Sequence, residues 1–263
     1  MTGPLVAAQA AVFAAFGLVV GSFLTVVVYR IPRKMSLVRP RSACPGCGMQ
    51  IRSVDNIPVV SWLARRGRCR ACDERISPRY PATEAATAAL FVSAAIGYQD
   101  DLYLAVTMAL FFAMLLAVSL VDLEHKIIPN RIVYPAAIVF PALMLLGALM
   151  GKDLSPAHEA LGAVAYGGGL FLVWLVYPKG MGMGDVKLAV VIGAVLGALG
   201  LELVPVAAML TFFLGALGGV LAVAVGTKGR KSTIPFGPFM AAGAVLAALL
   251  GAEIADWYLG LFT

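Results

Sequence analysis

The sequence lacks the residue patterns that most hydrolases use. Its two histidines, His125 and His158, do not stand in the His-Glu-x-x-His pattern of zinc-dependent peptidases. No Gly-x-Ser-x-Gly segment is present, which excludes the nucleophile elbow of the α/β-hydrolases. Charged residues make up only 13% of the chain, so few side chains remain that can move a proton. For a hydrolase, a pair of carboxylates therefore fits this sequence better than either of these patterns.

Polar surface is also scarce. Apolar residues make up 61% of the 263 residues, and the mean hydropathy is +0.91, whereas soluble domains are about half apolar or less. We therefore predict an all-α polytopic membrane protein whose solvent is mainly lipid. The first apolar run has no basic n-region and no small-residue cleavage site, so we expect a retained first span and not a signal peptide. Eight apolar runs predict eight transmembrane helices, at residues 5–29, 83–98, 102–121, 132–150, 157–177, 186–201, 203–226 and 237–259.

The net charge of +6 does not indicate nucleic-acid binding, because the charges lie in the loops between spans. With eight spans the loops alternate between two sides of the membrane, and 19 of the 20 Lys and Arg residues fall on one side. Only Lys152 lies on the other side. The positive-inside rule therefore places the basic side in the cytoplasm and both termini outside. The cluster Lys228, Arg230 and Lys231 belongs to this topology signal.

All four cysteines lie in residues 30–82, the one long polar stretch. They form two C-x2-C pairs, Cys44/Cys47 and Cys69/Cys72, separated by 21 residues. Four thiolates at this spacing are typical of a structural zinc site, and a structural disulfide is disfavoured in a reducing cytoplasm. A redox pair is the alternative. The stretch is too small for a hydrophobic core, so we expect the metal to supply its folding energy.

Two carboxylates stand at one predicted depth. Asp122 directly follows the third apolar run, and Asp185 precedes the sixth within Gly180-Met-Gly-Met-Gly184-Asp185. Glycines at alternate positions permit a positive φ and a close approach by another chain. If the two spans pack together, the acids share one proton, and one can activate water while the other acts as an acid. The alternative for Asp185 alone is a helix N-cap, and for Asp122 alone a solvated acid beside the membrane.

Other polar residues have weaker grounds for a role. Asp55, Glu124 and His125 are expected to be solvated loop residues. Glu84, predicted in the first turn of the second span, either complements the helix dipole or contributes to a cofactor site. The segment from Pro235 to Gly237 precedes the last span and can line the same cytoplasmic mouth as the two acids.

These segments resemble the type IV prepilin leader peptidases. The matching segments are Gly21-Ser-Phe-Leu24 through Tyr29-Arg-Ile-Pro32, the two C-x2-C pairs, Asp55-Asn-Ile-Pro-Val-Val-Ser-Trp62, Ile76-Ser-Pro-Arg-Tyr-Pro81 with Glu84, Asp122-Leu-Glu-His-Lys-Ile-Ile-Pro-Asn130, Gly180-Met-Gly-Met-Gly-Asp-Val-Lys-Leu188 and Ile234-Pro-Phe-Gly-Pro-Phe239. Two positions depart from the family pattern: Thr25 stands where Asn is common, and Asn130 where Asp is common.

The resemblance implies two activities in a bacterial cytoplasmic (inner) membrane. One removes the leader of type IV prepilins or pseudopilins, as used in type IV pili and type II secretion, with Asp122 and Asp185 as the catalytic pair and Gly182, Gly184, Pro235 and Gly237 beside the substrate. The other methylates the new N-terminus with S-adenosylmethionine, supported by the metal module of Cys44, Cys47, Cys69 and Cys72. No nucleic acid is implied as a partner.

We expect three parts: a first helix at 1–29, a cysteine module at 30–82 and a seven-helix protease domain at 83–263. Two other classes of protein compete with this interpretation. A membrane transporter with a structural zinc module would also place acids and Gly-rich backbone in the membrane, although transporter sites favour the midplane. A zinc-dependent membrane scaffold would need no acid pair.

Overall fold

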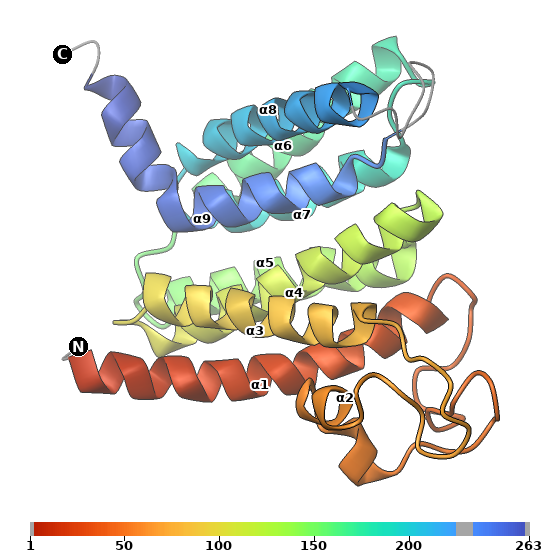
Figure 1. The fold of residues 1–263 in the computed structure, drawn as a ribbon. Coiled ribbons are helices and arrows are strands. Elements are labelled where there is room, and N and C mark those ends of the chain that lie inside the picture. Colours follow the sequence, from red (N-terminus) through yellow and green to blue (C-terminus); the bar gives the residue numbers. More distant parts are fainter. Residues whose placement is uncertain (1–2, 225–233, 261–263) are drawn as a thin grey trace. The chain divides into compact units, whose positions relative to one another are not determined.

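The computed structural model describes residues 3–224 and 234–260 (Figure 1). The chain divides into two compact units, residues 1–113 and 114–263. Helices dominate both units. Within the described ranges no sheet forms, and the only extended pairings are two isolated bridges in the cysteine stretch. The predicted all-α class is therefore confirmed. The basic cluster Lys228, Arg230 and Lys231 lies outside the described residues.

The first unit contains α1 (Gly3–Arg30), the short 3-10 helix η1 (Ser53–Asn56), α2 (Val60–Ala64) and α3 (Arg79–Gly97). Helix α4 (Leu102–His125) begins in this unit and ends in the second. Two glycines let α1 and α3 pack closely. A Cβ on Gly17 would lie 2.6 Å from the Cα of Ala88, and one on Gly21 would lie 2.7 Å from the Cα of Glu84. In lipid no hydrophobic effect draws helices together, so close van der Waals packing between small residues stabilises such an interface.

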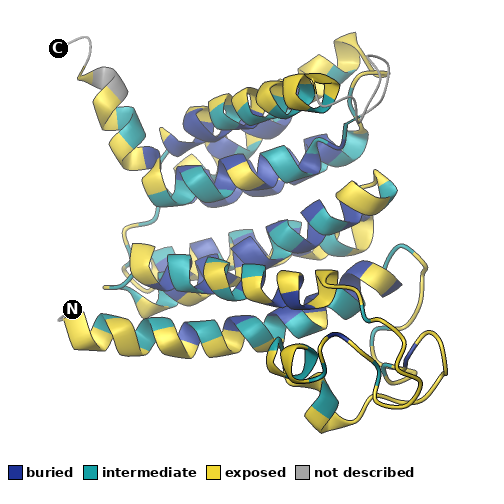
Figure 2. Ribbon diagram, in the orientation of Figure 1, coloured by how far each residue is buried: buried dark blue, intermediate teal, exposed yellow. Residues whose placement is uncertain are grey.

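The second unit holds the end of α4 and five further helices, α5 (Asn130–Leu149), α6 (Pro156–Val176), α7 (Met183–Leu199), α8 (Leu203–Ala224) and α9 (Gly237–Leu259). Helix α7 is the most deeply enclosed of the five, with most of its residues buried (Figure 2). Its seam with α6 is built from glycine, because a Cβ on Gly162 would lie 2.2 Å from the carbonyl oxygen of Gly193. Helices α6 and α8 are joined by a buried hydrogen bond of 3.0 Å between the hydroxyls of Tyr166 and Thr211.

Each of the eight apolar runs corresponds to one long helix. Six helices in the described ranges are long and apolar enough to cross a membrane: α1, α4, α5, α6, α8 and α9. Helix α7 has 17 residues, below the length of an ordinary span, and α3 begins with Arg79 and contains Glu84. A multi-pass membrane protein is thus supported, with six spans by length and composition.

Candidate functional site

Asp185 lies in the first turn of α7, where 8% of its surface is exposed. Its Oδ2 accepts a hydrogen bond of 3.0 Å from the N–H of Gly182, the residue that precedes the helix. The carboxylate therefore satisfies one of the free N–H groups at the helix start, although Asp185 is not the N-cap itself. Gly182 has φ −81°, an ordinary value, so the expected positive φ is not used here. The expected close approach is found at Gly184, where a Cβ would lie 2.8 Å from the Cβ of Ile128.

Asp122 lies near the end of α4 and is only 5% exposed, so it is not a solvated acid. Its Oδ2 accepts a hydrogen bond of 2.9 Å from the N–H of Gly237, the first residue of α9. A Cβ at Gly237 would lie 2.9 Å from the same oxygen, so only glycine leaves this approach open. Pro235 is buried just before this contact. The structure thus brings the start of α9 to Asp122.

Asp122 and Asp185 stand 63 positions apart in sequence, and a negative charge on Asp122 disfavours one on Asp185. Both belong to the second unit, and both side chains are largely removed from solvent. Two carboxylates in such a setting do not both ionise at low cost, and sharing one proton relieves the repulsion. An ionised and a protonated carboxyl side by side can remove a proton from water and supply one to a leaving group.

The four cysteines of the first unit form one cluster, with all four sulfurs within 4.8 Å of one another. All four are free thiols, and the sulfurs of Cys44 and Cys72 are 3.7 Å apart. That distance is too long for a disulfide, in which the sulfurs are about 2.0 Å apart. It matches the separation of about 3.8 Å expected for two thiolates bound tetrahedrally to zinc at about 2.3 Å. The donor set therefore fits a tetrathiolate metal ion.

Each C-x2-C pair stands on its own tight turn, and the two turns have the same hydrogen-bond pattern. We call residues 44–49 the first cysteine turn and residues 69–74 the second. The N–H of Cys44 donates to the carbonyl of Met49, and the N–H of Cys69 donates to that of Glu74. The bridges Ala43–Gln50 and Arg68–Arg75 close the two turns. N–H groups of Cys72 and Ala71 lower the pKa of the Cys69 thiol to about 6. For Cys72, which is exposed, the Glu74 N–H lowers the pKa, but partial desolvation and the three neighbouring thiols outweigh it and raise the value to about 12. A bound cation favours the thiolate form at every such position.

Comparison with known proteins bears on both clusters. Residues 15–98 match the model of the bacterial peptidase A24 N-terminal domain, and residues 109–223 match that of the type IV leader peptidase family. A protein of Bacillus subtilis named prepilin leader peptidase/N-methyltransferase is 37% identical over 93% of this chain and 95% of its own length. The chain belongs to the type IV leader peptidase family. Proteins of the same name from Pseudomonas putida (35% identical, 90% of this chain and 89% of the relative) and Pseudomonas aeruginosa (35%, 92% and 91%) agree. No solved structure matches the chain.

The two family models divide the candidate residues. The N-terminal model covers the four cysteines and Glu84, whereas the leader peptidase model covers Asp122 and Asp185. Gly237 lies beyond the end of the second match, and its contact with Asp122 is visible only in the structure.

Glu84 is buried, with 8% of its surface exposed. The sequence placed it in the first turn of its helix, but α3 begins at Arg79, so Glu84 falls in the second turn. There its Oε2 accepts a hydrogen bond of 2.7 Å from the N–H of Val59. Its carboxylate therefore holds the backbone just before α2. This hydrogen bond, and not an interaction with the helix dipole, is the main contact of Glu84. Its proposed place in a cofactor site is a prediction that this contact does not test.

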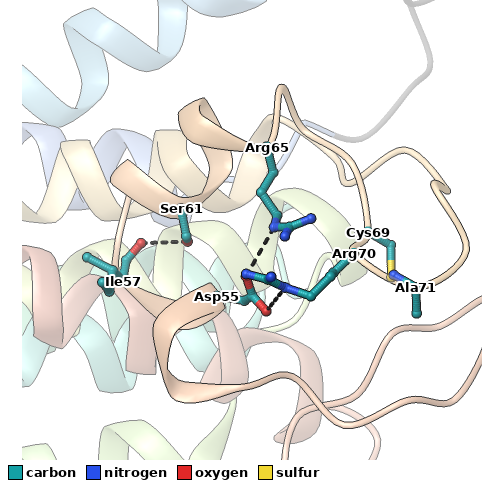
Figure 3. A network of polar contacts seen from close by, with 7 residues as sticks. All are labelled: Asp55, Ile57, Ser61, Arg65, Cys69, Arg70 and Ala71. Carbon is teal, nitrogen blue, oxygen red and sulfur yellow. Dashed lines mark hydrogen bonds and ion pairs between the residues drawn. The ribbon is translucent and has the colours of Figure 1, made fainter.

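The prediction of a solvated Asp55 is wrong. The Asp55 side chain is only 14% exposed and accepts hydrogen bonds from Arg65 (3.1 Å) and Arg70 (2.6 and 2.8 Å) (Figure 3). The Arg70 guanidinium holds the pKa of this carboxyl below its ordinary value. Because Arg70 stands between Cys69 and Cys72, the ion pairs join η1 to the second cysteine turn. Glu124 and His125, also expected in a loop, form the last turn of α4, where their side chains lie 3.8 Å apart.

A polar bridge between α5 and α7 was missed by sequence reasoning. The Nζ of Lys187 donates to the Oδ1 of Asn130 at 3.1 Å and to the hydroxyl of Tyr134 at 2.9 Å. The ammonium also lies 4.9 Å from the centre of the Tyr134 ring. Lys187 is two residues from Asp185, and its place in the glycine-rich segment was the one available signal. Asn130 gives this ammonium a neutral acceptor.

Proposed function

We propose that this protein is a prepilin leader peptidase that removes the leader of type IV prepilins or pseudopilins with an aspartate pair and then methylates the new N-terminus. Family membership and the names of the relatives support the reaction class. The observation that supports the mechanism is the pair itself. Asp122 and Asp185 come from two helices of one unit, are buried and each accept one backbone N–H.

In the proposed reaction the ionised carboxyl of the pair takes a proton from a water molecule, and the water oxygen attacks the carbonyl carbon of the scissile peptide bond. The protonated carboxyl gives its proton to the departing nitrogen as the C–N bond breaks. The products are the leader with a new carboxyl terminus and the pilin with a free amine. The N–H groups of Gly182 and Gly237 fix the orientation of the two carboxylates and cost no reorganisation during the reaction.

The test is leader removal by purified Asp122→Asn and Asp185→Asn proteins. Each substitution keeps the side-chain shape but removes a proton donor and acceptor, so we expect cleavage to fall at least about 100-fold, the scale of general acid–base catalysis. Asp153→Asn, at an exposed acid in the loop before α6, is the matched control and should retain full activity. Substantial cleavage by either dyad variant, at normal membrane insertion, contradicts the assignment.

The cysteine cluster is proposed to hold one structural zinc ion through Cys44, Cys47, Cys69 and Cys72. A zinc ion with four thiolates has no open coordination position, so it supplies folding energy to residues 30–82. S-adenosylmethionine is the proposed methyl donor, and the free amine of the cleaved pilin is the acceptor. Elemental analysis of the purified wild type should find roughly one zinc per chain, and Cys44→Ser should lose it. Absence of metal together with paired thiols contradicts this proposal.

For the membrane we propose eight spans, with α3 and α7 added to the six that meet the length and composition of a span. The asymmetry of Lys and Arg then places the cysteine module and the aspartate pair on the cytoplasmic face of the bacterial inner membrane, with both termini outside. The proposed parts are the first helix at 1–29, the cysteine module at 30–82 and the membrane protease domain at 83–263.

A further inference from the structure

Residues 53–64 of the first unit expose four large apolar side chains, which we call the strip. Val54 of η1 and Ile57 just after it are three residues apart, and so are Val60 and Leu63 of α2. Their exposed fractions are 61%, 48%, 59% and 61%. Four large apolar side chains exposed within ten residues are the kind of surface that contacts a partner or a membrane.

The contacts of Glu84 place this strip at the level of α1. Glu84 packs against Gly21 of α1, and its carboxylate holds the N–H of Val59 at 2.7 Å. Gly21 stands nine residues before Arg30, the last residue of α1, which is about 13 Å along the helix axis. The start of α2 is therefore level with the second half of α1 and does not lie beyond its end (Figure 1).

The length of α1 places that level near the surface of the bilayer. Its 28 residues extend about 42 Å, whereas the hydrocarbon core is about 30 Å thick. The start of α1 is apolar and its end carries Arg30, so the surplus of about 12 Å belongs at the Arg30 end. The boundary between acyl chains and headgroups then falls at about the level of Gly21. At that depth an irregular backbone needs its polar groups satisfied from within the protein, and Glu84 does this for Val59.

The charges at the ends of the strip fit the same location. Arg52 precedes η1 and Arg66 follows α2, and both are exposed. Arginine side chains flanking an apolar segment extend toward the phosphates of anionic lipids while their stems remain in the apolar zone. Arg65, by contrast, is held by Asp55 and keeps the two short helices together.

We propose that residues 53–64 form an interfacial membrane segment, with Val54, Ile57, Val60 and Leu63 inserted among the acyl chains of an anionic bilayer and Glu84 fixing its depth. The segment fastens the cysteine module to the membrane surface, since Asp55 and Trp62 join it to the second cysteine turn through Arg70 and the carbonyl of Ile76. The proposal rests on α1 crossing the bilayer and is independent of the peptidase assignment.

The test uses the full-length protein in vesicles of phosphatidylethanolamine and phosphatidylglycerol, with bromine on the acyl chains near the carbonyl end. A tryptophan is introduced by Val60→Trp or, as a second position, Leu63→Trp, and the emission of the wild-type protein is subtracted. Met49→Trp is the matched control, because Met49 is also 59% exposed but lies on the first cysteine turn.

We expect brominated lipid to remove about half or more of the emission added by Val60→Trp and Leu63→Trp, since interfacial helices bury their apolar face about 5–10 Å deep. Met49→Trp should instead be quenched by iodide in the aqueous phase. Equal lipid quenching at the two sites, or iodide quenching of Val60→Trp, contradicts the proposal. Shielding of Val60→Trp from both quenchers contradicts it as well and indicates that a protein surface covers the strip.

Discussion

At the scale of single residues, the acids of this protein are held in two different ways. Asp122 and Asp185 each accept a hydrogen bond from a backbone N–H of glycine. Asp55 instead lies between the guanidinium groups of Arg65 and Arg70. A permanent cation favours the ionised form of a carboxyl strongly, which suits a structural ion pair. A neutral amide orients a carboxylate while leaving room for a proton, as general acid–base chemistry requires.

The Asp55 ion pairs should make the stability of the cysteine module depend on pH. Because the Arg70 hydrogen bond lowers the pKa of folded Asp55 below the ordinary 3.8, the stabilisation is present above that value and is lost as the pH falls through the folded pKa. Melts followed by tryptophan emission, to which Trp62 of this module contributes beside Trp174 and Trp257, should therefore separate wild type from Asp55→Asn at neutral pH. Trp62 reports on the module because it donates to the Ile76 carbonyl. The separation should shrink in acid. A difference that stays constant into strong acid contradicts this role for Asp55.

At the scale of helices, the seam between α6 and α7 fixes where Asp185 stands. Gly162, Gly193 and Gly197 let the two backbones touch, and the N–H of Ser155 donates to the carbonyl of Ala198. Lys187 joins the other side of α7 to α5. Because lipid supplies little driving force for helix association, this close packing and the polar bridge hold α7 in place.

Gly162→Ala should therefore destabilise the second unit. The new Cβ would lie 2.2 Å from the carbonyl oxygen of Gly193, and overpacking of this kind costs about 1–3 kcal/mol. Gly169→Ala in the same helix is the matched control, because nothing lies within 4 Å of its added Cβ. Thermal unfolding in detergent measures the difference. Equal melting temperatures for the two variants would show that the seam tolerates separation.

Sequence patterns predicted the helices better than their contacts. A long apolar run in lipid forms a helix, because a helix satisfies all of its backbone hydrogen bonds within one segment. Each predicted run corresponds to a helix in the structure. The hydrogen bond from the N–H of Gly237 to Asp122 joins residues that are 115 positions apart. It forms only where the start of α9 meets the end of α4, and no local sequence pattern encodes that meeting. Asp55 was taken as solvated because its arginine partners are brought to it by the fold of a loop.

At the scale of the whole molecule, the two candidate sites lie in different units. The cysteine cluster belongs to residues 1–113, and the aspartate pair belongs to residues 114–263. Hydrolysis needs water and the two acids, whereas methyl transfer needs a free amine and a bound methyl donor. We therefore expect the two proposed reactions to be separable by mutation.

The most direct measurement follows both reactions in the same preparations of wild type, Asp185→Asn and Cys44→Ser. Mass spectrometry records leader removal from an intact prepilin and methyl incorporation into a pilin peptide supplied already cleaved. Wild type should perform both reactions. Asp185→Asn should lose leader removal and still methylate the cleaved peptide, and Cys44→Ser should lose methylation more severely than cleavage. Leader removal by Asp185→Asn at the wild-type rate, or loss of both activities in a folded Asp185→Asn protein, would contradict this account.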